Sequence, residues 1–175
     1  FGGFGAYTRY DASFGLDDAF GGGARFGYFI TNHLGLEVDV LFQTAQDIPG
    51  TSSSFEPMMG GGSLLLNLPV GNMGTLFVLG GYSRLDFGTT NPYRFTDGAF
   101  HGGAGIRLSL SQHAAIRVEG RAMYTPETQG AFGNQSAQHF MASAGFAVFH
   151  SSGSPRPPKD ADTERAPLDG DQDGV

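Results

Sequence analysis

The chain has 175 residues, of which 29 are glycine and 16 phenylalanine, and it contains no cysteine and no tryptophan. A net charge of -7 argues against a protein that neutralises nucleic-acid phosphates, and the absence of cysteine excludes disulfides and thiolate metal sites. The length suits one domain, or one domain with an appendage, large enough for a core or a closed barrel. The glycine and aromatic content favours β-structure over helices.

Apolar residues alternate with polar residues or glycine in successive stretches of the chain. The clearest stretch runs from Leu34 to Gln43, where even positions are apolar and odd positions include Glu37 and Asp39. Because successive side chains of a strand point to opposite faces, this stretch predicts a strand with one apolar and one ionic face. No stretch approaches the roughly 20 apolar residues of a membrane-spanning helix, which leaves a closed barrel as the other way to cross a bilayer.

Eight strands are predicted, each close to the length that a tilted transmembrane strand requires. Short links follow the second, fourth and sixth strands, and longer links rich in acidic residues, glycine and proline follow the odd-numbered ones. This alternation predicts an all-β fold, an eight-stranded antiparallel up-and-down transmembrane barrel with its short turns on the periplasmic side. The expected strands cover residues 3–10, 20–30, 34–43, 58–68, 76–87, 99–110, 115–124 and 139–149.

Composition divides the chain into a barrel over residues 1–150 and a linker over residues 151–175. The linker has no aromatic residue, four prolines, and six acidic against three basic residues. Such a segment cannot bury enough apolar surface to fold alone, so we expect a disordered periplasmic tail. At the start, Phe1-Gly2-Gly3-Phe4 shows no basic residue followed by an apolar run, so a signal peptide either was removed or never existed.

The distribution of charge indicates which face of the barrel is inside. The sole lysine is Lys159, in the linker, whereas soluble surfaces are commonly about a quarter charged with both signs mixed. A soluble lipocalin-like barrel is therefore disfavoured, and we expect the apolar face toward lipid and the polar face in a narrow, filled lumen. The predicted lumen network is Arg9, Arg25, Glu37, Asp39, Arg84, Asp86, Arg107, Arg117, Glu119 and Arg121, and the predicted lipid face includes Phe77, Leu79 and Phe87 of the fifth strand.

The turn positions predict which charges face one another across neighbouring strands. A turn centred on residue 32 places Arg25 opposite Asp39, and a turn centred on residue 113 places Arg107 opposite Glu119. Opposite charges directly across an antiparallel pair are favourable. A two-residue shift at the second of these turns would instead place Arg107 opposite Arg117, which is unfavourable.

A resemblance to a known family is carried by two features of the sequence. They are glycine-aromatic strands such as residues 19–28, and the last strand with its final aromatic Phe149. Residues 1–150 resemble the barrel of the outer-membrane protein A (OmpA-like) superfamily. The resemblance implies a bacterial outer-membrane location, contact with lipid and lipopolysaccharide, and a monomer. The terminal aromatic residue resembles the signal that the outer-membrane assembly machinery reads. No nucleic-acid partner is expected.

The end of the linker, Asp169-Gly170-Asp171-Gln172-Asp173-Gly174, resembles the Asp-rich calcium repeat of thrombospondin type 3. In many OmpA-like relatives such a segment joins the barrel to a periplasmic peptidoglycan-binding domain, which is not among these residues. Alternating carboxylates followed by glycine suit a hard cation, as at the start of an EF-hand loop. Asp169, Asp171 and Asp173 are the predicted calcium ligands, a solvated acidic linker is the alternative, and no other cofactor is expected.

These features predict a structural barrel that anchors a periplasmic domain and supports the integrity of the envelope. An adhesin or receptor that acts through the long external loops is the alternative, and a small pore is a minor one. We expect no enzyme and no catalytic residues. His101 and His139 fall near the outer rim, whereas Ser109 falls near the opposite end, so a Ser-His-acid set does not assemble.

Overall fold

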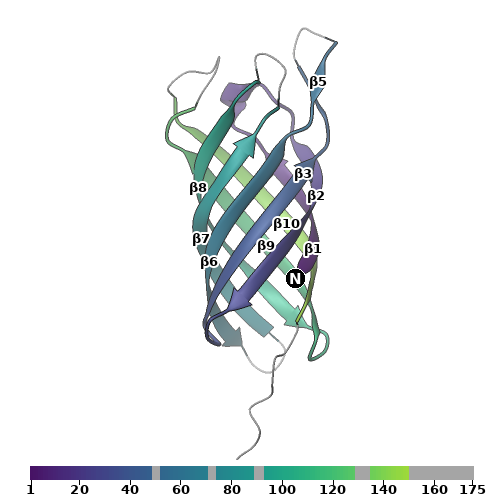
Figure 1. Ribbon diagram of the computed structural model, residues 1–175, viewed down its shortest axis with the longest axis vertical. Coiled ribbons are helices and arrows are strands. Elements are labelled where there is room, and N and C mark those ends of the chain that lie inside the picture. Colours follow the sequence, from purple (N-terminus) through teal and green to yellow (C-terminus); the bar gives the residue numbers. More distant parts are fainter. Residues whose placement is uncertain (49–51, 71–73, 89–92, 129–134, 150–175) are drawn as a thin grey trace, which may run out of the picture.

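The protein forms a closed barrel of eight antiparallel strands, which tilt around a common axis (Figure 1). The computed structural model describes residues 1–48, 52–70, 74–88, 93–128 and 135–149. Strand β1 pairs with both β2 and β10, which closes the barrel, and the predicted fold class is confirmed. The barrel strands are β1 (Gly2–Arg9), β2 (Ala19–Phe29), β3 (Leu34–Gln43), β6 (Met58–Val70), β7 (Gly74–Asp86), β8 (Thr96–Ser109), β9 (Ala114–Thr125) and β10 (Ala137–Val148).

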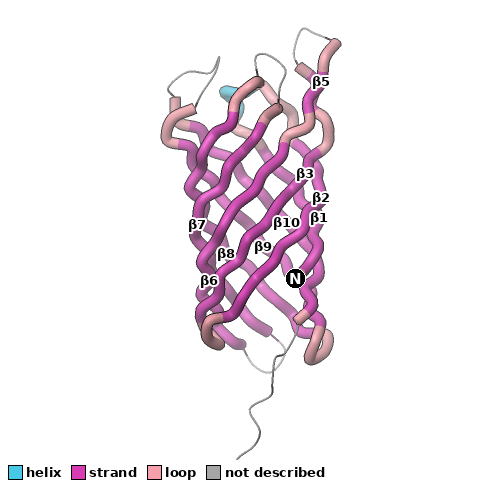
Figure 2. Tube along the Cα trace, viewed as in Figure 1, coloured by secondary structure: helices cyan, strands magenta, loops and turns pink. Residues whose placement is uncertain are grey.

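Smaller elements lie in the long loops, at the end of the barrel opposite to the short turns (Figure 2). A 3-10 turn, η1 (Ala12–Phe14), follows β1, and the two-residue strands β4 (Gln46–Asp47) and β5 (Ser54–Phe55) pair with each other after β3. Their sequences are too short to carry a periodic signal, which is why they were not predicted. No helix among the described residues is long and apolar enough to cross a membrane.

Pairing between neighbouring strands follows the predicted register after β2 and departs from it after β8. Arg25 lies opposite Asp39, as predicted. Arg107, however, lies opposite Arg117 instead of Glu119, so this prediction was wrong. The turn is closed by hydrogen bonds from the amides of residues 110 and 111 to the carbonyl of residue 114, which centres it one residue earlier than expected. A one-residue change in the centre moves the partner by two positions and keeps both side chains in the lumen.

The outer face of the barrel is apolar around its whole circumference. Large hydrophobic side chains there are exposed, for example Phe26 at 62 % and Val38 at 57 %. On six of the eight strands the structure places the predicted residues on this face. Other exposed members of the set are Phe20, Tyr28, Leu36, Phe42, Leu64, Leu66, Leu68, Leu76, Val78, Phe100, Leu108, Ile116, Val118, Tyr124, Phe140 and Phe146.

On β1 and β7 the structure inverts the predicted faces. Arg9 and Arg84 point outward and are exposed, whereas Phe77, Leu79 and Phe87 are buried inside. The prediction was wrong because it assumed a polar lumen along the full length of each strand, while both ends of the lumen are in fact lined by apolar side chains. An arginine near a strand end can face outward, because its stem lies on apolar surface and its guanidinium reaches the polar boundary.

Two adjacent glycines of β7 show how tightly the lumen is filled. A Cβ at Gly81, which faces inward, would lie 2.0 Å from the carbonyl oxygen of Gly62 and 2.8 Å from Nε2 of His101. A Cβ at Gly80, which faces outward, would meet its nearest neighbour at 3.8 Å, an ordinary contact. A side chain is therefore tolerated on one face of β7 and not on the other.

We predict that Gly81→Ala destabilises the barrel by about 1–3 kcal/mol, the usual cost of overpacking a filled interior. Gly80→Ala adds the same methyl group on the outer face and should leave the free energy of unfolding nearly unchanged. Urea unfolding of both variants refolded into phospholipid bilayers measures the difference. Equal losses in the two variants would contradict the close approach at Gly81.

Candidate functional site in the lumen and at its loop end

Six charged side chains meet in the middle of the barrel and form what we call the lumen ionic network. Each has a side-chain exposure of 7 % or less. Arg117 Nη1 lies 2.6 Å from Glu37 Oε2, and Arg121 Nη2 lies 2.6 Å from Asp39 Oδ2. Strands β3 and β9, which supply most of these groups, stand on opposite sides of the closed barrel. The members are Arg25, Glu37, Asp39, Arg117, Glu119 and Arg121.

Glu119 is the centre of this network because it contacts all three of its arginines. Arg25 Nη1 donates to Oε2 at 2.9 Å, Arg117 Nε donates to Oε2 at 2.7 Å, and Arg121 Nε donates to Oε1 at 2.8 Å. Hydrogen bonds between charged groups are roughly twice as strong as neutral ones. Loss of one member would leave a buried charge without compensation, which is strongly destabilising.

Four residues predicted for the network lie elsewhere. Arg9 and Arg84 face outward, near the loop end of their strands. Asp86 is the last residue of β7 and accepts a hydrogen bond from the amide of Gly88 at 3.0 Å. Arg107 does lie in the lumen, nearer the short turns, but forms no ion pair within the part of the chain that the structure describes.

His101 is held between two serines, a contact that the sequence did not predict. Ser63 Oγ lies 2.8 Å from Nε2, and Ser83 Oγ lies 2.8 Å from Nδ1. Ser83 can reach the ring because β7 turns its odd-numbered residues inward. Among the described residues no carboxylate is hydrogen-bonded to His101, so the cluster lacks the third group of a Ser-His-acid arrangement.

The loop end of the lumen is closed by a layer of rings that we call the aromatic plug. Ring centroids lie 4.6 Å apart for Phe55 and Tyr93, and 4.9 Å apart for Phe87 and Phe95. Three long loops and strand β10 supply these rings, so the loops fold inward over the barrel. All members are buried, and they are Tyr10, Phe14, Phe55, Phe87, Tyr93, Phe95 and His139.

Asp11 ties the first long loop to strand β10 beside the plug. Its Oδ1 accepts hydrogen bonds from Ser13 N at 2.9 Å and Ser13 Oγ at 2.7 Å, and its Oδ2 accepts one from Gln138 N at 2.8 Å. The Asp11 amide donates to Nδ1 of His139 at 3.1 Å. The bond from Gln138, followed by those from Ser13, lowers the pKa of the Asp11 carboxyl, because these donors favour its charged form.

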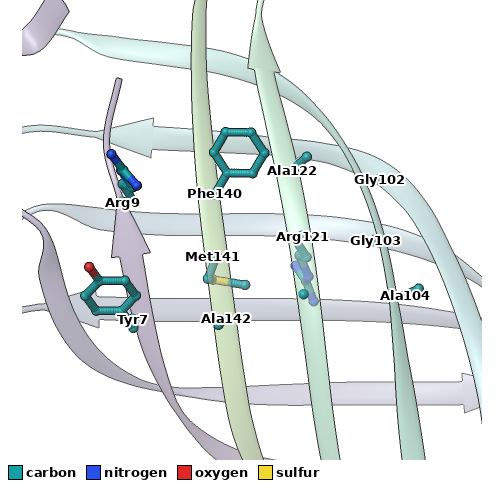
Figure 3. Close-up of a pocket in the computed structure, with 11 residues that line it drawn as sticks. Tyr7, Arg9, Gly102, Gly103, Ala104, Arg121, Ala122, Phe140, Met141 and Ala142 are labelled. Atoms are coloured by element: carbon teal, nitrogen blue, oxygen red, sulfur yellow. The ribbon is translucent and has the colours of Figure 1, made fainter. Parts of the chain in front are cut away.

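A hollow of about 560 Å³ lies across β1, β10, β9 and β8, lined largely by outward-facing residues. Small side chains on adjacent strands leave this space open, where phenylalanine and leucine cover other parts of the barrel. Figure 3 shows Tyr7 and Arg9 on β1 beside Phe140 on β10, at one side of the hollow. The small lining residues are Gly102, Ala104, Gly120, Ala122 and Ala142.

A closed eight-stranded barrel with an apolar outside and a charged, filled inside is the architecture of an outer-membrane β-barrel. The family described as "Outer membrane protein beta-barrel domain" matches residues 2–148, and the chain belongs to this family. The predicted location in the bacterial outer membrane is thereby confirmed, and the outer face described above is the lipid-facing surface.

Solved structures that resemble the chain include the following two. Neisserial surface protein A (NspA) has a TM-score of 0.64 and 17% sequence identity, over 84% of this chain and 94% of that chain. Ail, the attachment invasion locus protein of Yersinia pestis, has a TM-score of 0.47 and 11% identity, over 84% of this chain and 93% of that chain. No protein with a curated description matches the sequence. The first likeness supports the barrel fold alone.

The predicted calcium ligands Asp169, Asp171 and Asp173 lie outside the described residues. Calcium binding by this segment stays a prediction from the sequence.

We predict that Glu119→Gln destabilises the barrel by about 3–5 kcal/mol, because it leaves buried guanidinium groups without their shared carboxylate. Glu127→Gln removes the same charge from an exposed loop position and should have little effect. Urea unfolding in phospholipid bilayers compares the two variants. A loss for Glu119→Gln no larger than that of the loop variant would contradict the central role of Glu119.

The amide signal of Gln138 should report the protonation of Asp11. In detergent micelles we expect its chemical shift to change at a pH below about 3.9, the ordinary pKa of aspartate. Because the folded-state pKa is lowered, the stabilisation of the loop end is complete above the ordinary value and is lost as the pH falls through the lowered pKa. Asp11→Asn should remove the transition and Asp17→Asn should preserve it, whereas a midpoint at or above the ordinary value would contradict the hydrogen bonding.

Proposed function

We propose that this protein is a structural outer-membrane barrel that anchors a periplasmic domain and supports the integrity of the envelope. The observation that carries the proposal is the filled lumen, which the lumen ionic network crosses and the aromatic plug covers. The interior of a small eight-stranded transmembrane barrel is just wide enough for side chains to fill it. A barrel whose interior is filled by cross-links between opposite strands suits an anchor better than a small pore.

The connectivity of the chain supports the same role. The amino group of Phe1 donates to the carbonyl of Val148 at 3.0 Å, so both ends of the barrel lie together at the short-turn end. In outer-membrane barrels the short turns face the periplasm. Residues 150–175 would therefore continue into the periplasm, where a downstream domain would supply the contact with peptidoglycan.

We propose outer-membrane lipid and lipopolysaccharide as the partners of the lipid-facing surface. Arg9 and Arg84 are exposed near its loop end, and each follows by two positions an outward tyrosine, Tyr7 or Tyr82. Tyrosine and arginine at this level are typical of a membrane boundary, and a guanidinium fork suits a phosphate. The hollow beside Arg9 offers room for an acyl chain.

A surface-binding module, either an adhesin or a receptor, is the alternative function. The aromatic residues of the long loops that the structure describes are buried in the plug, which leaves mainly polar and charged described side chains for an external partner. Exposed acidic residues in these loops favour a partner of complementary charge. They are Asp17, Asp18, Asp47, Glu56 and Glu127.

The two functions are separated by changing the exposed loop charges, because deletion of whole loops would also remove the plug. In cells that lack the protein, a variant with these five acids changed to asparagine or glutamine should restore resistance to detergent and exclusion of vancomycin. A chain that ends after Phe149 should reach the membrane equally well but fail to restore either. If the loop variant keeps the envelope intact and loses only cell attachment, the surface-binding function is supported instead.

A further inference from the structure

Arg107 is buried in the lumen, with 7 % of its surface exposed, and forms no ion pair within the described residues. Its Nη1 donates to Oδ1 of Asn67 at 3.4 Å, and its Nε has no hydrogen-bond partner in that part of the chain. A guanidinium stays charged in proteins, and a buried charge without a counter-charge is unfavourable. Binding of an anion would therefore supply the counter-charge that this guanidinium lacks among the described residues.

Three rings position this guanidinium near the short-turn mouth of the barrel. Its central carbon lies 5.2 Å from the ring of Phe29, 5.4 Å from that of Phe77 and 5.8 Å from that of Phe149. Phe29 is the last residue of β2 and Phe149 follows the end of β10, so both mark the short-turn end. Aromatic faces attract a cation but accept few of its hydrogen bonds, which leaves donors for an anionic partner.

The neighbouring charges add to this preference for an anion. Arg117 lies directly opposite Arg107 on β9, and its carboxylate partners, Glu37 and Glu119, are shared with the rest of the lumen ionic network. Arg107 and the network together bring four guanidinium groups against three carboxylates into this part of the described lumen. The surplus positive charge lies on the side toward the periplasm.

We propose that Arg107 forms an anion-binding site at the short-turn mouth, and that carboxylates of residues 160–173 of the same chain occupy it. This segment contains six acidic residues and one basic residue. The eleven positions from Phe149 to Asp160 can span up to roughly 35 Å when extended, so the acids can return to the mouth. A short connection between two binding groups keeps their effective concentration near the millimolar range, enough for a weak contact.

Docking of this segment goes beyond the anchoring role, because it holds the linker against the barrel. It would shorten the distance from the barrel that a domain after the linker can reach. The contact between a guanidinium and the carboxylates of the linker would be weakened by salt, because ions screen the charges before they meet. It would therefore form and break reversibly.

The test uses the full chain, in which the absence of cysteine lets Leu168→Cys carry a single nitroxide label. In detergent micelles at low salt, we expect the label to broaden the amide signals of the short turns at 30–33 and 110–113. High salt should reduce this broadening by about threefold or more, because the charges are screened. Arg107→Gln should reduce it equally, whereas Arg84→Gln, which removes an outward arginine near the loop end, should not.

A second variant serves if Arg107→Gln does not fold. Changing the six acids of residues 160–173 to asparagine or glutamine leaves the barrel untouched and should abolish the broadening. The proposal is overturned if the broadening is absent in the wild type or persists in both variants. It is also overturned if inorganic phosphate shifts the Asn67 signal while neutralising the tail has no effect, since the occupant would then be a free anion.

Discussion

The narrow lumen of an eight-stranded barrel is the constraint on which the rest of the structure depends. Charged groups that a strand sends inward cannot reach bulk water, so their partners must come from strands across the barrel. Glu119 on β9 meets this requirement by contacting three arginines, and Arg117 extends the contact to Glu37 on β3, the strand opposite in the closed ring. The same side chains that fill the interior therefore connect its two sides. The apolar outer face can then be left entirely to lipid.

The alternating pattern was enough to predict the fold, the eight strands and the faces of six of them, because central strand segments combine a charged lumen with a lipid-facing surface. It failed on β1 and β7, where polarity changes along the strand and Arg9 and Arg84 lie outward near the rim. Ser83 lies on the same face of β7 as the inward Gly81. This polar residue was a signal that could have corrected the predicted inward face of β7. The position of Arg107 opposite Arg117 depended on one residue in a turn, which hydrophobic patterning does not determine.

The aromatic plug could not be predicted, since its rings come from loops that are far apart in the sequence and become neighbours only after the barrel closes. Loops on a rigid barrel are usually regarded as free to vary and available for recognition. Here Phe14, Phe55 and Tyr93 have their apolar surface inside. The loops therefore have two parts, an inner one constrained by packing and an outer one that is free to diverge.

The seam between β1 and β10 has a consequence for how the barrel assembles. Near its loop end Asp11 accepts a hydrogen bond from Gln138, 127 positions later in the chain, and at its other end Phe1 donates to Val148. The other strand pairs of the barrel join segments adjacent in its order along the chain, so they can form locally at a smaller cost in chain entropy. The seam between β1 and β10 can close only after the intervening strands have paired and the sheet has curved into a barrel. Insertion of this protein thus ends with the meeting of its first and last strands, and until then both carry an open edge.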